Sequence, residues 1–530
     1  MCKLVGMTNK SHELKYEMVK DLEGYLCFGN NYTVRCENLY KVDNDTLIAI
    51  YGDIDPNVLY KIYKNEGIKG FNRLEGGFAF AIITNSEIVL ARDHLGINSL
   101  FYAFVDDELY FSDDILFLVK YLGLNKIDKN GILQLLSTCP MIINSKTVYK
   151  DIYRINPGEA LIFKDNISHV KYFDFVKETI NSDLDDVIDN IKKNINVGKK
   201  GATLLSGGLD SSIVLSLLGK NTNSYTIKYE NNDFKKDKFL ISDDLNFVGY
   251  MIDKYKSNNK IIEITNDDLI NNLSLAVDLR GYPAMSSIDS SLLTLLNKIN
   301  EDVIYTGEGS DEIFSGYPWC YNTYPYQSRF PWLRNISFKE SIINKKYKGL
   351  IDNFINEEYS LAYKNCNNED KNTFINYLNL KYFLPNLLER QEKMANNSKK
   401  EMISPFVNIN LAKLMYNIDN EYKFLNNKEK GLLREAYKDQ LPEEIYSRKK
   451  SPYPKTNNKE FLLKIKNKLY KCLENKNSIL YELFDVEEIK KLDDNLDISW
   501  YGQLMNLAEL YAFLYQIDYW ANTYNIKIVE

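Results

Sequence analysis

The chain has 530 residues, of which 45% are apolar, so it is long enough for two or three domains with large cores. Its formal charge of -7 is spread along the sequence, and it contains no dense basic stripe of the kind that binds nucleic acid. Only three histidines occur, none of them four residues from another, and the seven cysteines form no C-x-x-C pair, which argues against a histidine triad, a zinc site or a disulfide framework.

The start of the sequence, MCKLVGMTNK, lacks the apolar core of a secretory signal. No run approaches the ~18 apolar residues that a membrane span needs. We therefore expect a cytoplasmic protein that binds neither a membrane nor nucleic acid.

The first 175 residues are expected to consist mainly of short strands. β-Branched and aromatic runs, separated by Asn, Asp and Gly, predict strands at 46–54, 76–84, 86–93 and 108–114. Helical spacing of apolar residues predicts helices at 57–67 and 131–137.

The pattern changes between residues 172 and 183. A predicted helix at 183–195 is followed by apolar strands at 202–206, 224–229, 260–264 and 302–307, with helical stretches between them. Such alternation is typical of a parallel sheet covered by helices. Beyond Tyr317 the sequence predicts helices almost to the end, so we expect two domains, 1–175 and 176–530.

The stretch TLLSGGLDSS, Thr203–Ser212, joins a predicted strand to a predicted helix. Gly207 and Gly208 can adopt backbone angles closed to other residues and allow a ligand to approach the backbone. The following helix directs its free N–H groups and positive dipole end to the same place. The corner also offers the hydroxyls of Ser206, Ser211 and Ser212 as donors and the carboxylate of Asp210 for Mg²⁺.

This corner therefore predicts a pyrophosphate site. It is not the G-x-x-x-x-G-K-[ST] loop, so transfer of the γ-phosphate is not implied. A glycine-rich turn with serine as the helix N-cap would be the structural alternative.

A second corner, YTGEGSDEIFSGYPW at 305–319, follows the strand at 302–307. The carboxyl ends of parallel strands meet at one edge of a sheet, so we expect the two corners to lie close together. Glu308, between Gly307 and Gly309, carries a carboxylate that can reach a reacting atom. A helix N-terminus that carries acidic residues is the alternative interpretation.

The first corner resembles the S-G-G-x-D-S corner of PP-loop ATP pyrophosphatases. With the second corner, the chain is similar to the glutamine-dependent asparagine synthetases, whose second motif reads S-G-E-G-S-D-E-x-F-G-G-Y. The similarity continues through GYPAMSSIDSSLL (281–293), FPWLRN (330–335), LLREAYKDQLPEEIYSRKKSPYPKT (432–456) and, in the first half, GGFAFAI, ARDHLGINSLFY and YRINPGEALIF.

This resemblance implies an α/β two-domain fold. Residues 1–175 would form a shortened α+β sandwich with αββα layers, like the Ntn-hydrolase amidotransferases of class II. Residues 176–530 would form a PP-loop ATP pyrophosphatase domain, with a helix-covered parallel sheet and a helical C-terminal part.

The resemblance also implies a reaction. A carboxylate substrate, aspartate in the family, attacks the α-phosphorus of MgATP and releases pyrophosphate, and ammonia then displaces AMP from the acyl adenylate. Glu308 would orient or deprotonate the nitrogen nucleophile, and Lys450 would meet the charge on the phosphate oxygens, with Lys449 as its alternative. The residues expected to line the adenosine pocket are Leu205, Ile227, Thr306 and Gly307. The expected magnesium ligands are Asp210 and Asp311.

In the first half, the Met-Cys start resembles a glutaminase whose nucleophile is Cys2, activated by its own α-amine once Met1 is removed. The family sends the ammonia through the protein. Asn38 stands where the family has the arginine that binds the glutamine carboxylate. Tyr51-Gly52-Asp53 aligns with the family's N-G-E, and Asp55 matches the residue that binds the α-amine.

The loss of the arginine removes a bidentate carboxylate clamp. Tyr51 in place of asparagine removes an oxyanion-hole donor, a change worth about 10²–10³-fold in rate. We therefore predict that glutamine hydrolysis is weak or absent.

Three functions remain open. The first is an asparagine synthetase fed by ammonia or glutamine, and the second is a relative that closes another amide, as in β-lactam or lasso-peptide formation. The third is a catalytically silent partner protein, but the presence of SGGLDSS, Glu308 and Lys450 argues against it.

Two residues depart from the family pattern in the second half. Ile403 and Ser315 replace the family's usual arginine and glycine near the expected carboxylate pocket. The sequence leaves the oligomeric state open, with a homodimer as one expectation.

Overall fold

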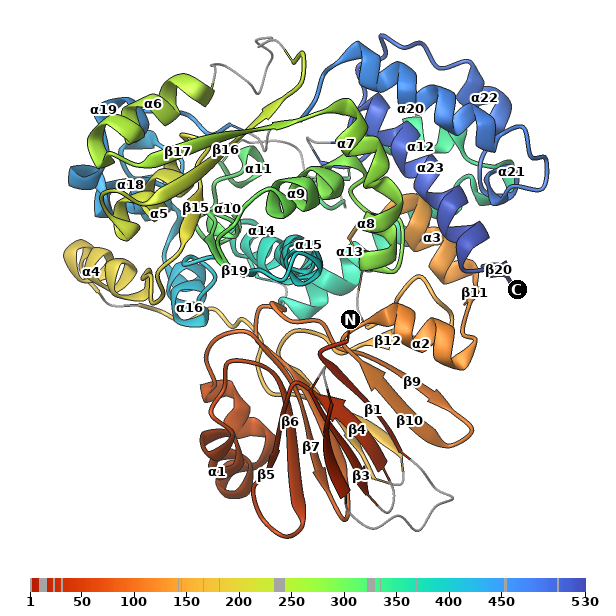
Figure 1. Cartoon of the computed structure of the whole chain (residues 1–530). Coiled ribbons are helices and arrows are strands. Elements are labelled where there is room, and N and C mark those ends of the chain that lie inside the picture. Colours follow the sequence, from red (N-terminus) through yellow and green to blue (C-terminus); the bar gives the residue numbers. More distant parts are fainter. Residues whose placement is uncertain are drawn as a thin grey trace.

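The computed structural model describes residues 2–530 except 9–16, 22–23, 30–31, 142, 144, 165, 181, 233–243, 322–328, 334, 368, 452–454 and 503–504. Figure 1 shows a lower body of stacked strands, formed by the first part of the chain, and a larger upper body in which helices surround one sheet.

Two antiparallel sheets form the lower body. The seven-stranded sheet has the order β12-β9-β10-β1-β4-β3-β2, with β1 (Leu4–Thr8), β2 (Glu17–Asp21), β3 (Gly24–Gly29), β4 (Tyr32–Cys36), β9 (Phe101–Val105), β10 (Glu108–Ser112) and β12 (Tyr153–Arg154). The six-stranded sheet has the order β14-β13-β8-β7-β6-β5, with β5 (Asn38–Lys41), β6 (Thr46–Gly52), β7 (Phe78–Thr84), β8 (Ile88–Arg92), β13 (Glu159–Phe163) and β14 (Ile167–Lys171).

Alternation along β6 shows how the layers pack. Leu47 and Ala49 lie in the core between the two sheets, while Ile48 and Ile50 lie in the core under α1 (Pro56–Glu66), which buries Leu59 there. On the other sheet, α2 (Ile115–Leu122) packs against β10. The αββα sandwich is therefore confirmed, and the six predicted elements of this half lie within two residues of those observed.

The sheet of the upper body has five strands, all parallel, in the order β17-β16-β15-β18-β19. These are β15 (Ala202–Leu204), β16 (Asn223–Tyr229), β17 (Asn258–Ile264), β18 (Val303–Tyr305) and β19 (Glu401–Ile403). The chain leaves β15 to form β16 on one side and returns to form β18 on the other. The edge between β15 and β18 is thus a topological switch point, where such sheets bind ligands.

Helices cover this sheet. Figure 1 shows α5 (Leu209–Leu218) and α6 (Asp244–Tyr255) on one side and α9 (Ser287–Asn297) and α15 (Leu384–Asn397) on the other. The other helices are α4 (Leu184–Asn194), α7 (Asn266–Asn271), α8 (Leu273–Arg280), α10 (Ser310–Ile313), α11 (Pro318–Tyr321), α12 (Ile336–Ile342), α13 (Leu350–Asn365), α14 (Lys371–Leu378), α16 (Ile409–Asn417), α17 (Asn420–Lys423), α18 (Gly431–Ala436), α19 (Glu443–Tyr446), α20 (Lys459–Cys472), α21 (Ile479–Leu483), α22 (Val486–Lys490) and α23 (Leu507–Thr523). A π-helical turn, Asn379–Phe383, joins α14 to α15.

The two halves of the sequence interlock. Strand β11 (Lys126–Ile127) pairs in parallel with β20 (Lys527–Ile528), and α3 (Lys129–Ser137) packs against α12 and α13 of the upper body. The division at residues 175 and 176 stays a prediction.

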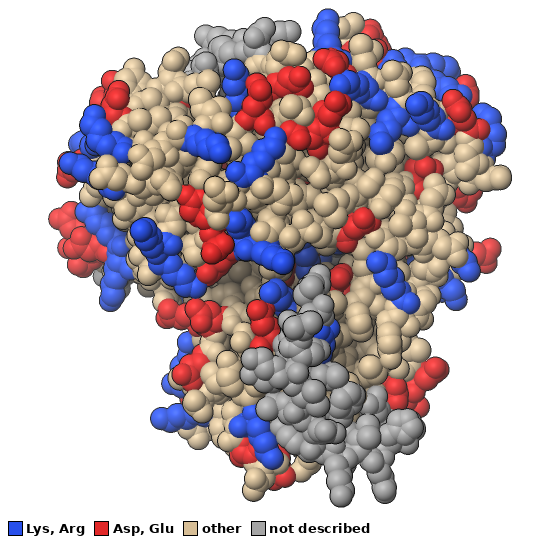
Figure 2. All heavy atoms as spheres, in the orientation of Figure 1, with Lys and Arg blue, Asp and Glu red and all other residues tan. Residues whose placement is uncertain are grey.

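Among the described residues, no helix combines the length and the apolar character needed to cross a bilayer. On the face shown in Figure 2, basic and acidic side chains are interspersed. That distribution is the one expected of a solvated surface with charge of both signs.

Candidate active site

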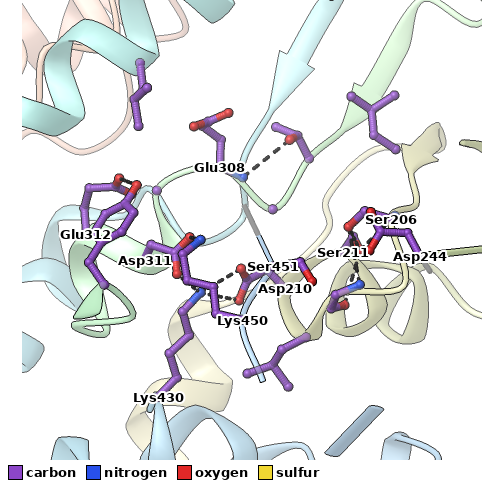
Figure 3. A pocket seen from close by; sticks show the side chains of 18 of the residues that line it. Ser206, Asp210, Ser211, Asp244, Glu308, Asp311, Glu312, Lys430, Lys450 and Ser451 are labelled. Atoms are coloured by element: carbon purple, nitrogen blue, oxygen red, sulfur yellow. Dashed lines mark hydrogen bonds and ion pairs between the residues drawn. The ribbon is translucent and has the colours of Figure 1, made fainter. Parts of the chain in front are cut away.

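A cavity of about 240 Å³ lies at the carboxyl ends of β15, β16 and β18. The glycine corner after β15 and the Glu308 loop after β18 both line it. Figure 3 shows side chains from these two corners in one view, with lysines that approach from a third part of the chain. The sheet topology therefore brings together the two motifs that the sequence places about a hundred residues apart.

The two glycines of the first corner have different roles. Gly207 has φ +67°, and a Cβ there would lie 2.7 Å from both Phe247 Cβ and Val248 N. Gly208 is the N-cap of α5, and a Cβ there would meet only Ser206 Oγ, at 3.3 Å. Within the described part of the chain, no side chain caps α5, so its first N–H groups remain free to bind an anion.

Hydroxyl groups shape this corner. Ser206 Oγ and Ser211 Oγ are 3.1 Å apart, and they accept hydrogen bonds from Gly208 N (3.3 Å) and Ser206 N (3.2 Å) respectively. Ser212 is fully buried and, like Gly207, does not line the cavity. Of the predicted hydroxyl donors, two therefore face the cavity.

Two carboxylates and two lysines meet beside the corner. Lys430 Nζ lies 2.7 Å from an oxygen of Asp210 and 2.7 Å from an oxygen of Asp311, and Lys450 Nζ lies 2.6 Å from the other Asp311 oxygen. Burial alone would raise the pKa of Asp311, but the two ammonium groups hold it below its ordinary value. Lys430 is almost completely buried, so it neutralises both acids away from solvent.

This arrangement fits Mg²⁺. A cationic group already stands between Asp210 and Asp311, the two residues predicted as ligands. In the described ranges there is no cluster of three or more His, Cys, Asp or Glu side chains that could hold a metal unaided. Magnesium on nucleotide phosphates needs only one or two carboxylates, because phosphate oxygens and waters complete its shell.

The Glu308 loop touches the first corner. A Cβ on Gly307 would lie 2.7 Å from Asp210 Cβ, so only glycine fits at this contact. The Ser404 hydroxyl donates a hydrogen bond to the Glu308 carbonyl oxygen, and Figure 3 shows the Glu308 carboxylate turned away from Lys430. Burial raises the pKa of Glu308, while the positive charge of Arg390 opposes the rise.

The basic cluster after α19 places its two lysines differently. Lys449 is exposed at the cavity, whereas the Lys450 ammonium pairs with Asp311 and lies 5.0 Å from the centre of the Tyr317 ring. This geometry favours Lys450 over Lys449, although its catalytic role stays a prediction.

The residues predicted for the adenosine pocket, Leu205, Ile227, Thr306 and Gly307, all line the cavity. The Thr226 hydroxyl donates to the Leu205 carbonyl oxygen at 2.8 Å, which fixes two neighbouring strand ends to each other. Several residues that line the cavity were not predicted from the sequence, namely Asp244, Arg390, Lys430, Arg448 and Tyr501. Arg448 lies within the stretch 432–456 that resembles the family, and the others belong to no motif.

Ile403 and Ser315 do not line the cavity. Ile403 ends β19, where its carbonyl oxygen accepts from Thr306 N at 2.9 Å. The Ser315 hydroxyl donates to Asn376 Oδ1 at 2.8 Å. Neither side chain therefore contributes to the surface of the cavity.

The thiol of Cys2 lies 3.9 Å from Asp114 Oδ2. Burial, together with the negative charges of Asp113 and Asp114, raises the pKa of Cys2 to about 12. This environment disfavours the Cys2 thiolate in the chain that still carries Met1, where Cys2 has no free α-amine.

The predicted glutamine-binding residues differ in their surroundings. Tyr51 accepts from Asn98 Nδ2 through its carbonyl oxygen (2.9 Å) and from Asn396 Nδ2 through its hydroxyl oxygen (2.8 Å). Gly52 has φ +135°, and a Cβ there would lie 2.3 Å from Gly77 O. Asp53 and Asp55 are exposed, and Asp55 is the N-cap of α1.

Two family models match the chain: Asparagine synthase over residues 189–522 and Glutamine amidotransferase domain over residues 36–173. The second match begins after Cys2. Glutamine-hydrolysing asparagine synthetase 3 of Bacillus subtilis (strain 168) is 30% identical over 496 residues, 87% of this chain and 81% of the relative. Amidase chyE of Penicillium rubens is 24% identical over 301 residues, 50% of this chain and 43% of the relative.

Among solved structures, the glutamine phosphoribosylpyrophosphate amidotransferase of B. subtilis with ADP and GMP has a TM-score of 0.22 and 13% identity, over 38% of this chain and 54% of that chain. This score is too low to carry an argument. The family is shown by the match of the synthase model and by the long alignment with the B. subtilis relative. Both agree with the cavity between the two corners. The chain belongs to the asparagine synthase family.

Proposed function

We propose that this protein is an ATP-dependent carbon–nitrogen ligase that converts aspartate to asparagine and releases AMP and pyrophosphate. The observation that carries the proposal is the contact between the two corners. Gly307 packs directly on Asp210, so the anion-binding start of α5 and the Glu308 loop face one cavity.

The nucleotide would bind across the switch point. The free N–H groups at the start of α5 and the hydroxyls of Ser206 and Ser211 would donate to the phosphates. Asp210 and Asp311 would hold Mg²⁺, which neutralises charge on the phosphate oxygens when bound. Lys430 would then be free to turn from the carboxylates to a phosphate.

Two steps would follow. The β-carboxylate of aspartate attacks the α-phosphorus, pyrophosphate leaves, and Lys450 meets the negative charge that develops on the phosphate oxygens. Ammonia then attacks the acyl carbon of β-aspartyl-AMP, and AMP leaves. Glu308, whose pKa is raised by burial, accepts a proton from the nitrogen more readily than an ordinary carboxylate does.

The remaining expectations are proposals of the same kind. We infer that ammonia, rather than glutamine, is the effective nitrogen donor, because the Cys2 thiol lies beside two carboxylates. We also propose that the enzyme requires magnesium and is located in the cytoplasm. We further propose that it forms a homodimer and binds neither nucleic acid nor membranes.

One experiment tests the function. MgATP is offered with aspartate and ammonia, with aspartate and glutamine, or alone, and pyrophosphate and asparagine are both measured. Asparagine made from ammonia supports the proposal. Pyrophosphate released only with another carboxylic acid would favour a relative that forms a different amide, and no release under any condition would mean a silent protein.

A further inference from the structure

A buried arginine joins the glycine corner to the loop that carries Lys450. Arg448 lines the cavity but is only 6% exposed. Its Nη1 donates to the Ser206 carbonyl oxygen at 3.3 Å, and its Nη2 donates to Ser451 Oγ at 3.0 Å. One guanidinium therefore connects the part of the site that would bind the phosphates to the loop that presents the catalytic lysine.

Two further contacts fix the charge and the plane of this guanidinium. Arg448 Nη2 also forms an ion pair with Asp244, the first residue of α6, and Figure 3 shows Asp244 next to Ser206. The guanidinium carbon lies 4.1 Å from the centre of the Phe247 ring. Gly207 packs on the same Phe247 side chain, so one residue supports both the arginine and the turn. Arginine suits this position because its planar fork can donate to several acceptors while it stacks on a ring.

The backbone of the Lys450 loop is held by other groups. Arg434 donates to the Arg448 carbonyl oxygen at 2.8 Å and to Glu429 Oε1 at 2.7 Å. Glu429 Oε1 also accepts from Lys450 N at 3.0 Å. These contacts fix the course of the loop within its own part of the chain. The Arg448 side chain instead reaches residues more than two hundred positions earlier, so it can set where the loop stands relative to the corner.

We infer that Arg448 is a positioning residue for the β- and γ-phosphates of the nucleotide. Through Ser206 it holds the shape of the corner that presents hydroxyl and backbone donors to these phosphates. Through Ser451 it holds the neighbouring Lys450 at a fixed place beside them. This inference rests on the proposed function, because that function places ATP at the corner. A displacement of about 1 Å within a reacting site can lower a rate by about 100-fold.

The inference distinguishes between classes of ligand. ATP and inorganic pyrophosphate both carry the phosphates that the corner would bind, whereas AMP would use only the adenosine pocket and the place of the α-phosphate. Loss of Arg448 should therefore weaken the binding of ATP and pyrophosphate and spare that of AMP. A general loss of structure would weaken the binding of all three ligands.

The test compares Arg448→Met with Arg154→Met in the full-length protein. Arg154 is a matched control because it is also a buried arginine in an ion pair, with Glu389, but it does not line the cavity. We expect Arg448→Met to raise Kd for ATP and for pyrophosphate, both measured with Mg²⁺, by about 10- to 100-fold, the range for the loss of a hydrogen bond to a charged group. Kd for AMP should change less than about twofold. Arg154→Met should leave all three Kd values unchanged, even where its Tm falls.

Two milder variants show how Arg448 acts. Ser451→Ala removes one acceptor of the guanidinium and should raise Kd for pyrophosphate by about three- to tenfold. It should add nothing to the effect of Arg448→Met, because both changes break the same link. Arg448→Lys should recover only part of the affinity, since an ammonium group is not a planar fork. Additive effects of Ser451→Ala and Arg448→Met would mean that the two residues act separately, and would overturn the inference.

Binding is measured without an acid substrate, so the outcomes separate this inference from the proposed function. If wild type binds ATP and pyrophosphate but forms no asparagine, the function is wrong, and the same variants still decide the role of Arg448. If wild type makes asparagine but Arg448→Met binds ATP and pyrophosphate as tightly as wild type, or loses AMP as strongly, only the inference is wrong. A wild type that binds none of the three ligands overturns both.

Discussion

Lys430 stands 220 residues from Asp210 in the sequence, yet its ammonium group lies 2.7 Å from both oxygens of that carboxylate. It also contacts Asp311, so one buried cation neutralises acids from two strand ends. Two carboxylates this close would repel each other in the absence of a cation. Lys430 thus neutralises this pair of carboxylates in the ligand-free protein.

Replacing Lys430 by methionine should destabilise the ligand-free protein by about 3 kcal/mol, the lower end for breaking a buried ion pair, because Asp210 is partly exposed. Mg²⁺ should restore much of this loss, since it can take the position between the carboxylates. Chemical denaturation with and without Mg²⁺ measures both effects. Lys449→Met, which removes an exposed charge at the same cavity, is the control. Equal stabilisation of variant and wild type by Mg²⁺ would contradict this view.

Glu308→Gln should lose asparagine formation by about 10²–10⁴-fold, the usual contribution of a general base. Pyrophosphate release should persist, because adenylation does not need this carboxylate. In wild type, synthesis should fall as the pH drops through the Glu308 pKa, at a higher pH than for an ordinary glutamate, because burial raises that pKa. A retained rate of synthesis in the variant would remove Glu308 from the mechanism.

The sign of the stability effect provides an independent check. A carboxyl group whose pKa is raised on folding costs stability once the pH exceeds its unfolded pKa. Glu308→Gln should therefore be at least as stable as wild type at neutral pH and lose this advantage at acidic pH.

At the residue scale, the sequence predicted what lies within a motif. Glu308 and Asp210 stand in contiguous strand–turn–helix patterns, and such patterns report their own geometry. Lys430, Arg390 and Tyr501 could not be found in this way. Their positions depend on how distant helices pack, and nothing adjacent to them in the sequence marks them.

The element that organises the site is the turn from β15 into α5. Its two glycines look alike in the sequence but differ in space. Gly207 is packed against Phe247 and Val248 with positive φ, whereas a Cβ at Gly208, at the start of the helix, would meet only the side-chain oxygen Ser206 Oγ, at 3.3 Å. The first therefore maintains the turn, and the second keeps the approach to the helix N-terminus clear.

Gly208→Val should fold with nearly unchanged Tm but lose nucleotide binding by at least about 100-fold, because its side chain would stand where phosphate meets the α5 backbone. Gly207→Val should instead lower Tm sharply, since its Cβ would lie 2.7 Å from backbone and side-chain atoms. Thermal unfolding and equilibrium ATP binding, measured on both variants, separate the two roles. Tight nucleotide binding by Gly208→Val would place the phosphates elsewhere.

Elements were predictable where periodicity is long enough to read. The four strands predicted in the first half, observed as β6, β7, β8 and β10, and the parallel strands β15 to β18 appear where alternation and apolar runs place them. Strand β19 has only three residues, and the π-helical turn at Asn379–Phe383 inserts into a continuous helical pattern. Neither has a period of its own, so neither could be predicted.

In the whole molecule, α15 connects the two bodies. Glu389 on this helix lies 2.5 Å from Arg154 of the first half, with both side chains buried, and Arg154 and Arg280 hold the pKa of Glu389 near 2. One turn further on, Lys393 Nζ donates to the Asp113 carbonyl oxygen at 2.6 Å. The change of sequence pattern near residue 175 predicts two domains, a division that stays a prediction. It could not predict the contacts of Arg154 with Glu389 and of Asp113 with Lys393, because each joins residues more than two hundred positions apart.

The same junction contains Cys2 and Tyr51, and from their surroundings we predict that glutamine is a poor nitrogen donor. In the chain that still carries Met1, burial and the negative charges of Asp113 and Asp114 raise the pKa of the Cys2 thiol, which disfavours the thiolate. Tyr51, which we predict to replace an oxyanion-hole asparagine, accepts a hydrogen bond from Asn396 of α15 through its hydroxyl oxygen. From both observations we predict that the first body stabilises the synthetase body and does not supply it with ammonia.

Glutamate release from glutamine should therefore be at least about 100-fold slower than ammonia-dependent asparagine formation, because the loss of one oxyanion-hole donor alone slows such reactions by about this factor. Cys2→Ala should leave ammonia-dependent synthesis unchanged, as should Cys472→Ala, a half-buried cysteine distant from the site whose pKa is also raised to about 12. Coupled assays of glutamate and asparagine, run on all three proteins, decide the matter. If wild type hydrolyses glutamine at a rate that matches synthesis and only Cys2→Ala abolishes it, substrate binding must displace the two carboxylates from the thiol, and the first body is a working glutaminase.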